Sequence, residues 1–441
     1  MPNATPVLPD AAPSEAAVGY GALIRGHRNF RLLWLGTVVS LFGDWFNTIA
    51  LYALVTALTG SPLAVGLVET LKLAGFALAS IPAGPLADRL DRRKLMIASD
   101  LLRAAIVPCF LLVDEAADLP LLYLLIVAQI SLGAVFDPAF RALLPNLVTE
   151  RELLPANTIL SATWSALLAL GASIGGLAAA GLGLEAVFII DAATYLVSAA
   201  CIAGIRMPAP APNAALPSAG ARVPLSAAFR VAAQDLVEGL TWLRAHRLVL
   251  RLSLAKTVWV VGGGGLVYLL TQLGPVLTPH DPALGIGLLF AARGLGTGIG
   301  PFIARRLFQR PSEWGLVAGF AVVFSGCAYL IAGALPATFF LMAPILAAHA
   351  ASGANWVLST VALQARVPDH VRGRILAVEL MTLTAVEAVF VLGTAALLES
   401  ASVTVTAAIL GCAGLQVLAG TGYALWMRAG RAAEAQPEPT A

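Results

Sequence analysis

Long apolar runs alternate with short polar breaks along the chain from residue 30 to residue 427. A helix needs about 20 apolar residues to cross a bilayer, because each residue adds about 1.5 Å along the helix axis. Twelve runs are long enough, and they lie at 30–58, 61–83, 95–113, 119–141, 157–183, 186–205, 248–277, 283–303, 314–334, 337–362, 374–398 and 402–427. We therefore predict an all-α membrane protein with 12 transmembrane helices.

The composition agrees with this pattern, since 59% of the residues are hydrophobic and only 12% are charged. The mean hydropathy is +0.85. A soluble globule of this composition would expose a very large apolar surface, so we expect the exterior to face the lipid bilayer. The formal net charge of +2 gives no sign of a nucleic-acid partner, and none is expected.

Positive side chains gather in every second loop, which predicts the orientation, because short loops rich in Arg and Lys stay in the cytoplasm. The basic loops contain Arg25, Arg28, Arg31, Arg89, Arg92, Arg93, Lys94, Arg141, Arg151, Arg305, Arg306, Arg310, Arg366, Arg372, Arg374, Arg428 and Arg431. The loops between them contain Asp114, Glu115, Asp118, Glu185, His280, Asp281 and Glu399. We expect a multi-pass protein of a bacterial plasma membrane with both termini in the cytoplasm.

Two stretches of the chain occur twice, about half a chain apart. GPLADRLDRR at 84–93 returns as GPFIARRLFQR at 300–310, and the segment 131–157 resembles 351–377. Duplicated halves are typical of transporters that bind substrate at the bilayer midplane, between repeats that rock against each other. The pattern therefore predicts two pseudo-symmetric six-helix bundles.

The composition shifts at 207–224, where Pro and Ala prevail, and a helical spacing of apolar residues follows from Phe229 to Leu243. We interpret this region as a cytoplasmic linker ending in an interfacial helix. The predicted boundaries are a disordered N-terminal tail at 1–29, a bundle at 30–206, the linker at 207–246, a bundle at 247–428 and a disordered C-terminal tail at 429–441.

Charged residues inside apolar runs are costly, so each is a candidate for function. Asp44, Glu69, Lys72, Arg293 and Glu387 lie well inside their runs. Asp44 and Glu387 are our first candidates for proton carriers, and Arg293 for contact with an anionic group. Glu69 and Lys72 are three residues apart on one helix face, which also fits a plain internal ion pair.

Three further charged residues, Asp191, Lys256 and Glu379, lie close enough to a predicted interface to reach water. Among the aromatic residues, Trp45, Phe46 and Trp356 are candidates for lining an apolar cavity, although Trp also suits packing and interfaces. Four successive glycines, Gly262 to Gly265, interrupt the seventh run, where we expect a bend or an unwound segment.

The loop at 84–93 resembles the signature loop between helices 2 and 3 of the major facilitator superfamily. The residues that match are Gly84, Leu86, Ala87, Asp88, Arg89, Arg92 and Arg93, whereas Asp91 stands where the family has a second glycine. The FDPAFRALLP stretch and the DLVEGLTWLR helix are similar to the branch of enterobactin exporters and macrolide efflux proteins. The resemblance implies the major facilitator fold and a transport function.

The signature loop has two readings. Asp88 and Arg89, with Asp100 and Arg103 on the next helix, would form a gating charge network, whereas Arg92 and Arg93 need do no more than set the topology. Helix 4 of the family normally carries an arginine four residues before a glycine, and here Gln129 precedes Gly133. This departure weakens the case for proton antiport.

We therefore expect a proton-driven exporter of small amphipathic or hydrophobic compounds, working as a monomer in the bilayer with the small molecule and protons as its partners. A lipid or lysophospholipid flippase of the same fold is an alternative. A membrane enzyme or assembly factor is another, but the chain shows no catalytic constellation, so no enzyme activity, metal or cofactor is expected.

Overall fold

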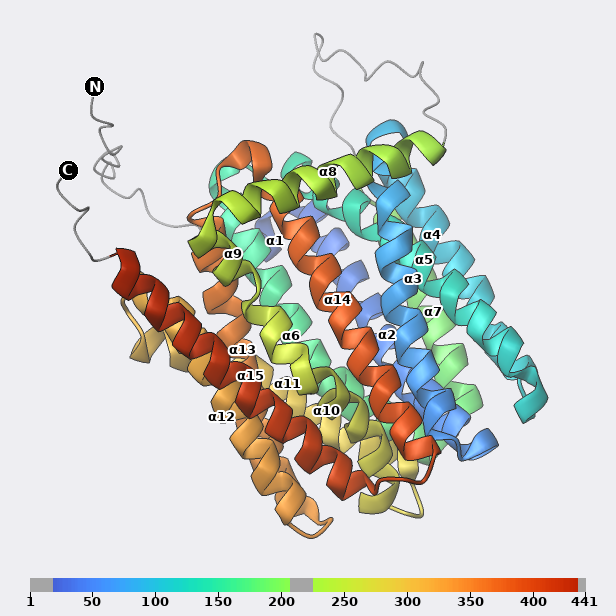
Figure 1. Ribbon diagram of the computed structural model, residues 1–441. Helices are drawn as coiled ribbons and strands as arrows, with labels where there is room; N and C mark the ends of the chain where they lie inside the picture. Colours follow the sequence, from blue (N-terminus) through green and yellow to red (C-terminus); the bar gives the residue numbers. More distant parts are fainter. Residues whose placement is uncertain (1–18, 207–224, 435–441) are drawn as a thin grey trace, which may run out of the picture.

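The computed structural model describes residues 19–206 and 225–434, and every regular element in those two segments is a helix (Figure 1). Twelve of the helices are long and apolar enough to cross a membrane. These spans coincide with the 12 predicted runs to within a few residues at most ends, so the predicted fold class is confirmed.

The first half of the molecule consists of α2 to α7, preceded by the short helix α1. The helix bounds are Tyr20–Gly26 for α1, Arg28–Thr59 for α2, Pro62–Arg89 for α3, Arg92–Ile106 for α4, Leu119–Leu143 for α5, Glu150–Leu182 for α6 and Leu184–Ala203 for α7. A 3-10 helix, Val107–Leu112, continues α4 after Ile106, and further short 3-10 turns lie at Ala116–Asp118 and Leu144–Asn146. Gly60 has a φ of 59° and ends α2, and Ser61 then caps α3 by accepting a hydrogen bond from the Ala64 amide.

The second half consists of α9 to α15 and is preceded by α8. The bounds are Leu225–Ala245 for α8, Arg247–Ser253 for α9, Ala255–Leu277 for α10, Pro282–Leu307 for α11, Trp314–Ala334 for α12, Met342–Gln364 for α13, Asp369–Glu399 for α14 and Val405–Glu434 for α15, with 3-10 turns at Pro311–Glu313 and Phe339–Leu341. Helix α8 lies across one end of the bundle, over α14 and α3 (Figure 1).

The helical parts of the two predicted tails differ from the expectation of disorder. Tyr20–Gly26 is helical because Leu23 is fully buried in a cluster with Phe30 and Met96, which ties this segment to the bundle. Helix α15 continues to Glu434, beyond the predicted boundary at 428. The predicted tail residues 1–18 and 435–441, and the linker residues 207–224, lie outside the described segments, and the domain boundaries remain predictions.

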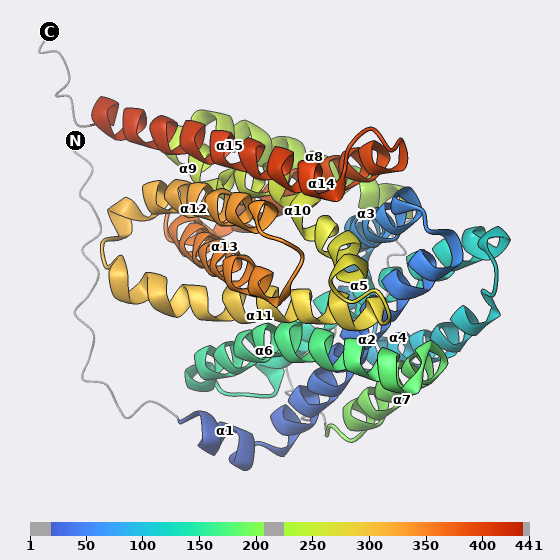
Figure 2. The same ribbon diagram turned by 90° about the horizontal axis from the view of Figure 1, so that it is seen from below.

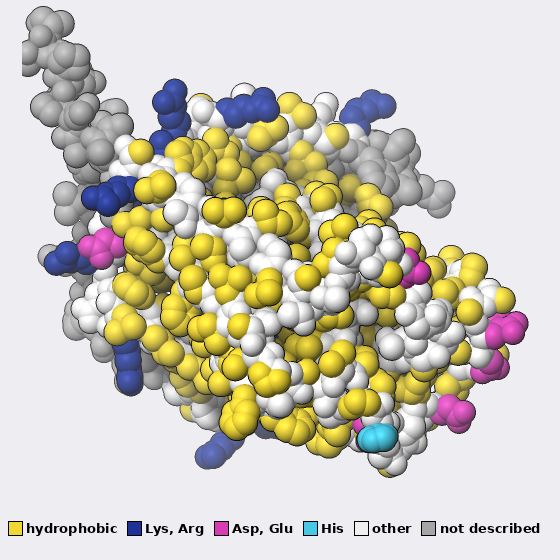
Figure 3. All heavy atoms as spheres, turned by 60° about the horizontal axis from the view of Figure 1, so that its bottom comes forward, with side chains coloured by type: hydrophobic (Ala, Val, Ile, Leu, Met, Phe, Trp, Pro, Cys, Tyr) yellow, Lys and Arg dark blue, Asp and Glu magenta, His cyan; other side chains and the backbone are white. Residues whose placement is uncertain are grey.

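Charged side chains separate toward opposite ends of the bundle. We call the end where α3 meets α4, α5 meets α6 and α11 meets α12 the basic end, because Arg92, Arg151 and Arg310 lie in or beside these connections. The end with Asp114, Glu185 and Asp281 is the acidic end. Figure 3 shows most of the visible Asp and Glu side chains at the right edge, Lys and Arg along the top, left and lower edges, and a broad, mainly hydrophobic face between them. This distribution is what a bilayer-spanning surface requires.

The two halves meet through α6 against α11 and α3 against α14 (Figure 2). Glycines allow the first of these contacts: a Cβ atom at Gly176 would lie 2.6 Å from the Ala283 carbonyl oxygen, and one at Gly287 would lie 2.7 Å from that of Ala172. Backbones can come this close only where both surfaces lack side chains. Since α11 begins at the acidic end, the contact lies in the acidic half of the bundle.

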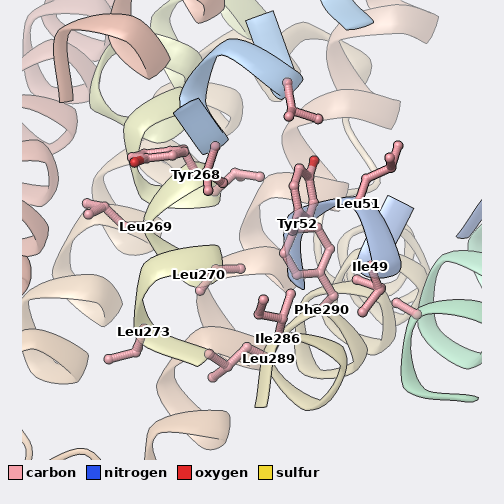
Figure 4. Close-up of a cluster of buried hydrophobic side chains, with 14 of the residues drawn as sticks. Ile49, Leu51, Tyr52, Tyr268, Leu269, Leu270, Leu273, Ile286, Leu289 and Phe290 are labelled. Carbon is pink, nitrogen blue, oxygen red and sulfur yellow. The ribbon is translucent and has the colours of Figure 1, made fainter. Parts of the chain in front are cut away.

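Apolar and polar contacts reinforce this junction. Tyr52 on α2 lies 6.1 Å from Phe290 on α11 between ring centroids, within a buried cluster that includes residues of α10 (Figure 4). At the end of α14, the Glu399 carboxylate accepts hydrogen bonds from the Ser61 hydroxyl at 2.7 Å and the Leu63 amide at 3.1 Å. The halves are therefore joined at the acidic end.

The bend expected at the four glycines is present in α10. Val261 and Gly262 have non-helical backbone angles, and the φ of Gly262 is 78°, which only glycine adopts without strain. A Cβ at Gly262 would collide with the Cys412 carbonyl of α15, so the glycine also permits a close helix contact.

Candidate functional site

A cavity of about 330 Å³ lies between the two halves, on the basic side of the junction. Its lining comes from α3 and α5 of the first half and from α13 and α14 of the second. The lining residues are Glu69, Lys72, Leu73, Phe76, Ile130, Trp356, Leu380, Leu383, Thr384 and Glu387. Four of the predicted site residues are thus brought together in one cavity that both halves build: Glu69, Lys72, Trp356 and Glu387.

Glu69 and Lys72 do not form the ion pair that their spacing suggested. The Tyr52 hydroxyl donates a hydrogen bond to the Glu69 carboxylate, and the Lys72 ammonium donates one to the Thr48 hydroxyl at 2.9 Å. Both partners lie on α2, so each charged side chain turns toward that helix and away from the other. The ion-pair interpretation is wrong because α2 offers each of them a separate partner.

Glu387 faces the cavity from α14. Its backbone packs against α10, where a Cβ at Gly264 would lie 3.2 Å from the Glu387 carbonyl oxygen. The Glu387 carboxylate has no ion pair within 4.0 Å and no hydrogen bond among the described residues. Arg293 of α11 acts on Glu387 only through longer-range electrostatics, and its guanidinium lies 5.3 Å from the Phe290 ring centroid.

The three candidate cavity aromatics have different positions. Trp356 lines the cavity and is 46% exposed. Trp45 and Phe46 instead pack α2 against α6, where a Cβ at Gly171 would contact Trp45 at 2.9 Å and one at Gly175 would contact Phe46 at 3.0 Å. The expectation that Trp45 and Phe46 line this cavity is therefore wrong, because they fill the groove opposite two glycines.

A second polar cluster lies inside the first half, behind the cavity. Tyr195 of α7 donates a hydrogen bond to the Asp44 carboxylate of α2 and accepts one from the Gln129 side-chain amide of α5 at 3.1 Å. The Arg103 guanidinium lies 4.3 Å from the Tyr195 ring centroid. Helices α2, α4, α5 and α7 thus each contribute a polar side chain to one buried site, which we call the Tyr195 cluster.

Two more carboxyl groups belong to the Tyr195 cluster. Asp100 forms an ion pair with Arg103 one turn along α4, and Asp191 lies on α7 facing Gly43. Both aspartates are fully buried, and one oxygen of each has no hydrogen bond within the described part of the chain. Arg103 therefore forms an ion pair with Asp100, and the carboxyl groups of Asp44 and Asp191 act on its guanidinium through longer-range electrostatics.

The fourth membrane-spanning helix of this chain is α5, and it lacks the arginine that is usual in the family. The position of Arg103 is relevant to this departure. A Cβ at Gly133 of α5 would lie 3.8 Å from a terminal nitrogen of Arg103, one turn from Gln129. A guanidinium from α4 therefore occupies the space beside α5. In the sequence, the spacing of Asp100 and Arg103 on one helix is the pattern that indicates a charged site here. Our prediction places both residues in a gating network with the loop at 84–93.

Thr48 connects the cavity with the Tyr195 cluster. Its hydroxyl accepts the hydrogen bond from Lys72 and donates one to the Asp44 carbonyl oxygen at 2.8 Å. The two charged sites are therefore separated by one turn of α2, and the Thr48 hydroxyl contacts both Lys72 and the main chain of Asp44. No pattern in the sequence had singled out Thr48 or Tyr195.

The signature loop holds helix ends together. Arg92 donates to the Ala142 carbonyl near the end of α5 at 2.9 Å, and Arg93 donates to carbonyls at the end of α7, including that of Ile202 at 3.0 Å. Cations at helix C-termini are stabilising, so these arginines do more than set topology. Asp91, which replaces the family glycine, caps α4 by accepting from the Lys94 amide at 3.1 Å.

The remaining loop predictions have mixed outcomes. Gly84 lies in α3, and a Cβ there would meet no atom within 4 Å, so no close contact explains it. The side chains of Asp88 and Arg89 lie outside the described part of the chain, and the gating network that includes them stays a prediction.

The second half has polar groups of its own. Lys256 and Glu379 form a buried ion pair at 3.1 Å, and Lys256 lies 4.6 Å from the Trp356 ring centroid. The Tyr329 hydroxyl and His349 Nε2 are hydrogen bonded at 2.8 Å. The expectation that Lys256, Glu379 and Asp191 reach water is wrong, because the bundle folds over all three.

Comparison with known proteins gives three informative matches. A family model described as Major Facilitator Superfamily matches residues 33–378. "Putative bacilysin exporter BacE" of Bacillus amyloliquefaciens is 26% identical over 368 residues, which are 79% of this chain and 84% of that protein. "Macrolide efflux protein A" of Streptococcus pyogenes is 29% identical over 181 residues, 41% of this chain, so the chain spans only 45% of that relative.

A solved structure shares the fold. A bacterial homolog of the human lysosomal transporter Spinster, in an inward-facing and unoccupied conformation, superposes with a TM-score of 0.67 at 18% identity. The superposition covers 91% of this chain and 97% of that one.

Proposed function

Since the chain belongs to the major facilitator superfamily, we propose that it is a proton-driven exporter of small amphipathic or hydrophobic compounds. The relatives named as a bacilysin exporter and a macrolide efflux protein support the direction of transport. In this proposal the protein lies in the bacterial plasma membrane, with its basic end and both termini in the cytoplasm, as the loop charges require.

The observation that carries the proposal is the cavity between the two halves, which pack closely against each other on its acidic side. The Gly176 and Gly287 contacts and the Glu399 hydrogen bonds join the halves at the acidic end. The cavity lies on the basic side of that junction, within reach of a compound arriving from the cytoplasm. Release to the outside then requires α6 to separate from α11 and α3 from α14.

Proton coupling is supported by the charge balance of the Tyr195 cluster. The cluster has three carboxyl groups and one guanidinium, so two carboxyl groups have no cation of the cluster to pair with, and each proton that binds removes one unit of this excess negative charge. The Lys72–Thr48–Asp44 connection gives the proton site a physical contact with the cavity. Asp44 is therefore the proton carrier in the proposed cycle.

The test uses purified protein in liposomes with an imposed proton gradient and two probes, ethidium and a macrolide. We expect gradient-dependent movement of at least one probe, lost on collapsing the gradient and reduced at least about tenfold in Asp44→Asn. Asp114→Asn, an exposed aspartate near the acidic end, is the matched control and should behave as the wild type.

Gradient-independent movement, or full activity of Asp44→Asn, would contradict proton coupling through this residue. If the same vesicles move labelled lysolipid and neither probe, the protein is a lipid flippase and the export proposal is wrong.

A further inference from the structure

We infer that the central cavity selects organic cations, meaning compounds with a fixed or protonated positive centre on an apolar body, and that Glu387 is the residue that anchors the charge. This inference deepens the proposed function and rests on it for its role in transport. The binding selectivity itself can be tested separately.

The charged groups of the cavity are not equally available to a ligand. Glu69 is hydrogen bonded to Tyr52, and Lys72 is hydrogen bonded to Thr48. Glu387 has no such partner among the described residues. A ligand that enters the cavity therefore meets one ionisable group without a partner among the described residues, and this group is the carboxyl of Glu387.

The nearby cations of the protein do not neutralise Glu387. Lys256 is held by Glu379 at 3.1 Å, Lys72 points to α2, and Arg293 lies over the Phe290 ring with no ion pair within 4.0 Å in the described segments. The lining residues include two carboxyl groups, those of Glu69 and Glu387, and one ammonium group, that of Lys72, so by formal charge the carboxyl groups are in excess by one. A positive ligand balances this charge, whereas an anion would add to it.

The rest of the lining suits an apolar body. Leu73, Phe76, Ile130, Leu380 and Leu383 surround the charged groups, and a volume of about 330 Å³ falls in the range of small-molecule sites. The Trp356 ring also lines the cavity. The face of an aromatic ring attracts a positive centre, so this ring suits the body of a cationic ligand.

Two probes of the same shape and opposite charge test this inference directly. Tetraphenylphosphonium is a cation and tetraphenylborate an anion, and both carry four phenyl rings. We expect the purified wild-type protein to bind the cation in equilibrium dialysis and to bind the anion at least about tenfold more weakly. Glu387→Gln should weaken cation binding by about tenfold or more, whereas Glu387→Asp should retain most of it.

Two controls separate charge recognition from damage to the fold. Glu185→Gln, an exposed carboxyl at the acidic end, should bind the cation as the wild type does. Glu69→Gln, which can still accept the hydrogen bond from Tyr52, should lose less affinity than Glu387→Gln. Equal binding of the two probes, or unchanged cation binding by Glu387→Gln, would overturn the inference.

The outcome is distinguishable from a failure of the proposed function. Cation binding that depends on Glu387 without movement of any probe in liposomes would overturn the transport proposal and support the binding site. Transport of a neutral compound without cation binding would overturn the binding site and support transport.

Discussion

The two halves of this molecule bury their charges in different ways. In the second half, the buried charges of Lys256 and Glu379 pair one to one at 3.1 Å, whereas Glu387 lines the cavity without such a partner in the described segments. In the first half, the Tyr195 cluster combines three carboxyl groups with the one guanidinium of Arg103, so its charges cannot all pair within the cluster.

This difference separates a structural role from a functional one. An ion pair of one cation and one anion can be replaced by apolar side chains of similar size with little loss of stability. Burying more carboxylates than cations costs free energy unless a cation binds to the cluster. In the proposed proton-coupled carrier, this cation is the proton. The comparison therefore predicts that the second half tolerates removal of its ion pair and the first half does not.

The largest effect is expected for Arg103→Met. Removing the only guanidinium of the Tyr195 cluster leaves buried carboxylates without a counter-charge, which costs about 3–5 kcal/mol of stability. The thermal unfolding midpoint of the purified protein should fall by several degrees, and transport should be lost. Arg305→Met, an exposed arginine at the basic end, should change neither. An unchanged midpoint in Arg103→Met would mean that the cluster does not depend on its cation.

The ion pair of the second half gives the contrasting prediction. Lys256→Met alone should cost about 3 kcal/mol, because it leaves Glu379 buried without its partner. The double variant Lys256→Met with Glu379→Leu should recover to within about 1 kcal/mol of the wild type and retain transport. A double variant that is stable but inactive would show that this pair has a role in transport.

A smaller effect is expected at the junction of the halves. The Cβ of Gly287→Ala would meet backbone atoms of α6, so the helices must separate at a cost of about 1–3 kcal/mol. Spin labels at Ala117 and Thr406, both exposed at the acidic end, should then report longer distances between the halves. Gly411→Ala, whose Cβ would meet nothing within 4 Å, is the control. Identical distance distributions in the two variants would contradict the closed junction.

The smallest effect is expected when a buried tyrosine loses its hydroxyl, and it should differ between Tyr195 and Tyr329. Tyr195→Phe and Tyr329→Phe each remove one hydroxyl with a buried partner, so each should cost about 1 kcal/mol. The pH profile of transport should be displaced only in Tyr195→Phe, because only Tyr195 touches the proposed proton carrier. A displaced profile in both variants would place proton binding in both halves.

The twelve helices could be predicted because run length and loop charge are local properties of the sequence. The bend at Gly262 was predictable for the same reason, since four glycines interrupt one run. The partners of the buried charges were not, because they depend on which helix faces which. Glu69 and Lys72 share a helix face, yet both side chains bind residues of α2. Asp191 lies near the end of a predicted run, yet it is buried in the bundle.

The central claim is that the Tyr195 cluster gives up a proton when the cavity takes up a cation. The direct test is to add saturating tetraphenylphosphonium to the purified protein in weakly buffered solution and to count the protons released with a pH-sensitive dye. The account predicts release of about one proton per bound cation by the wild type and by the Lys256→Met, Glu379→Leu double variant. It predicts almost none from Asp44→Asn, and release by Asp44→Asn equal to that of the wild type would contradict the account.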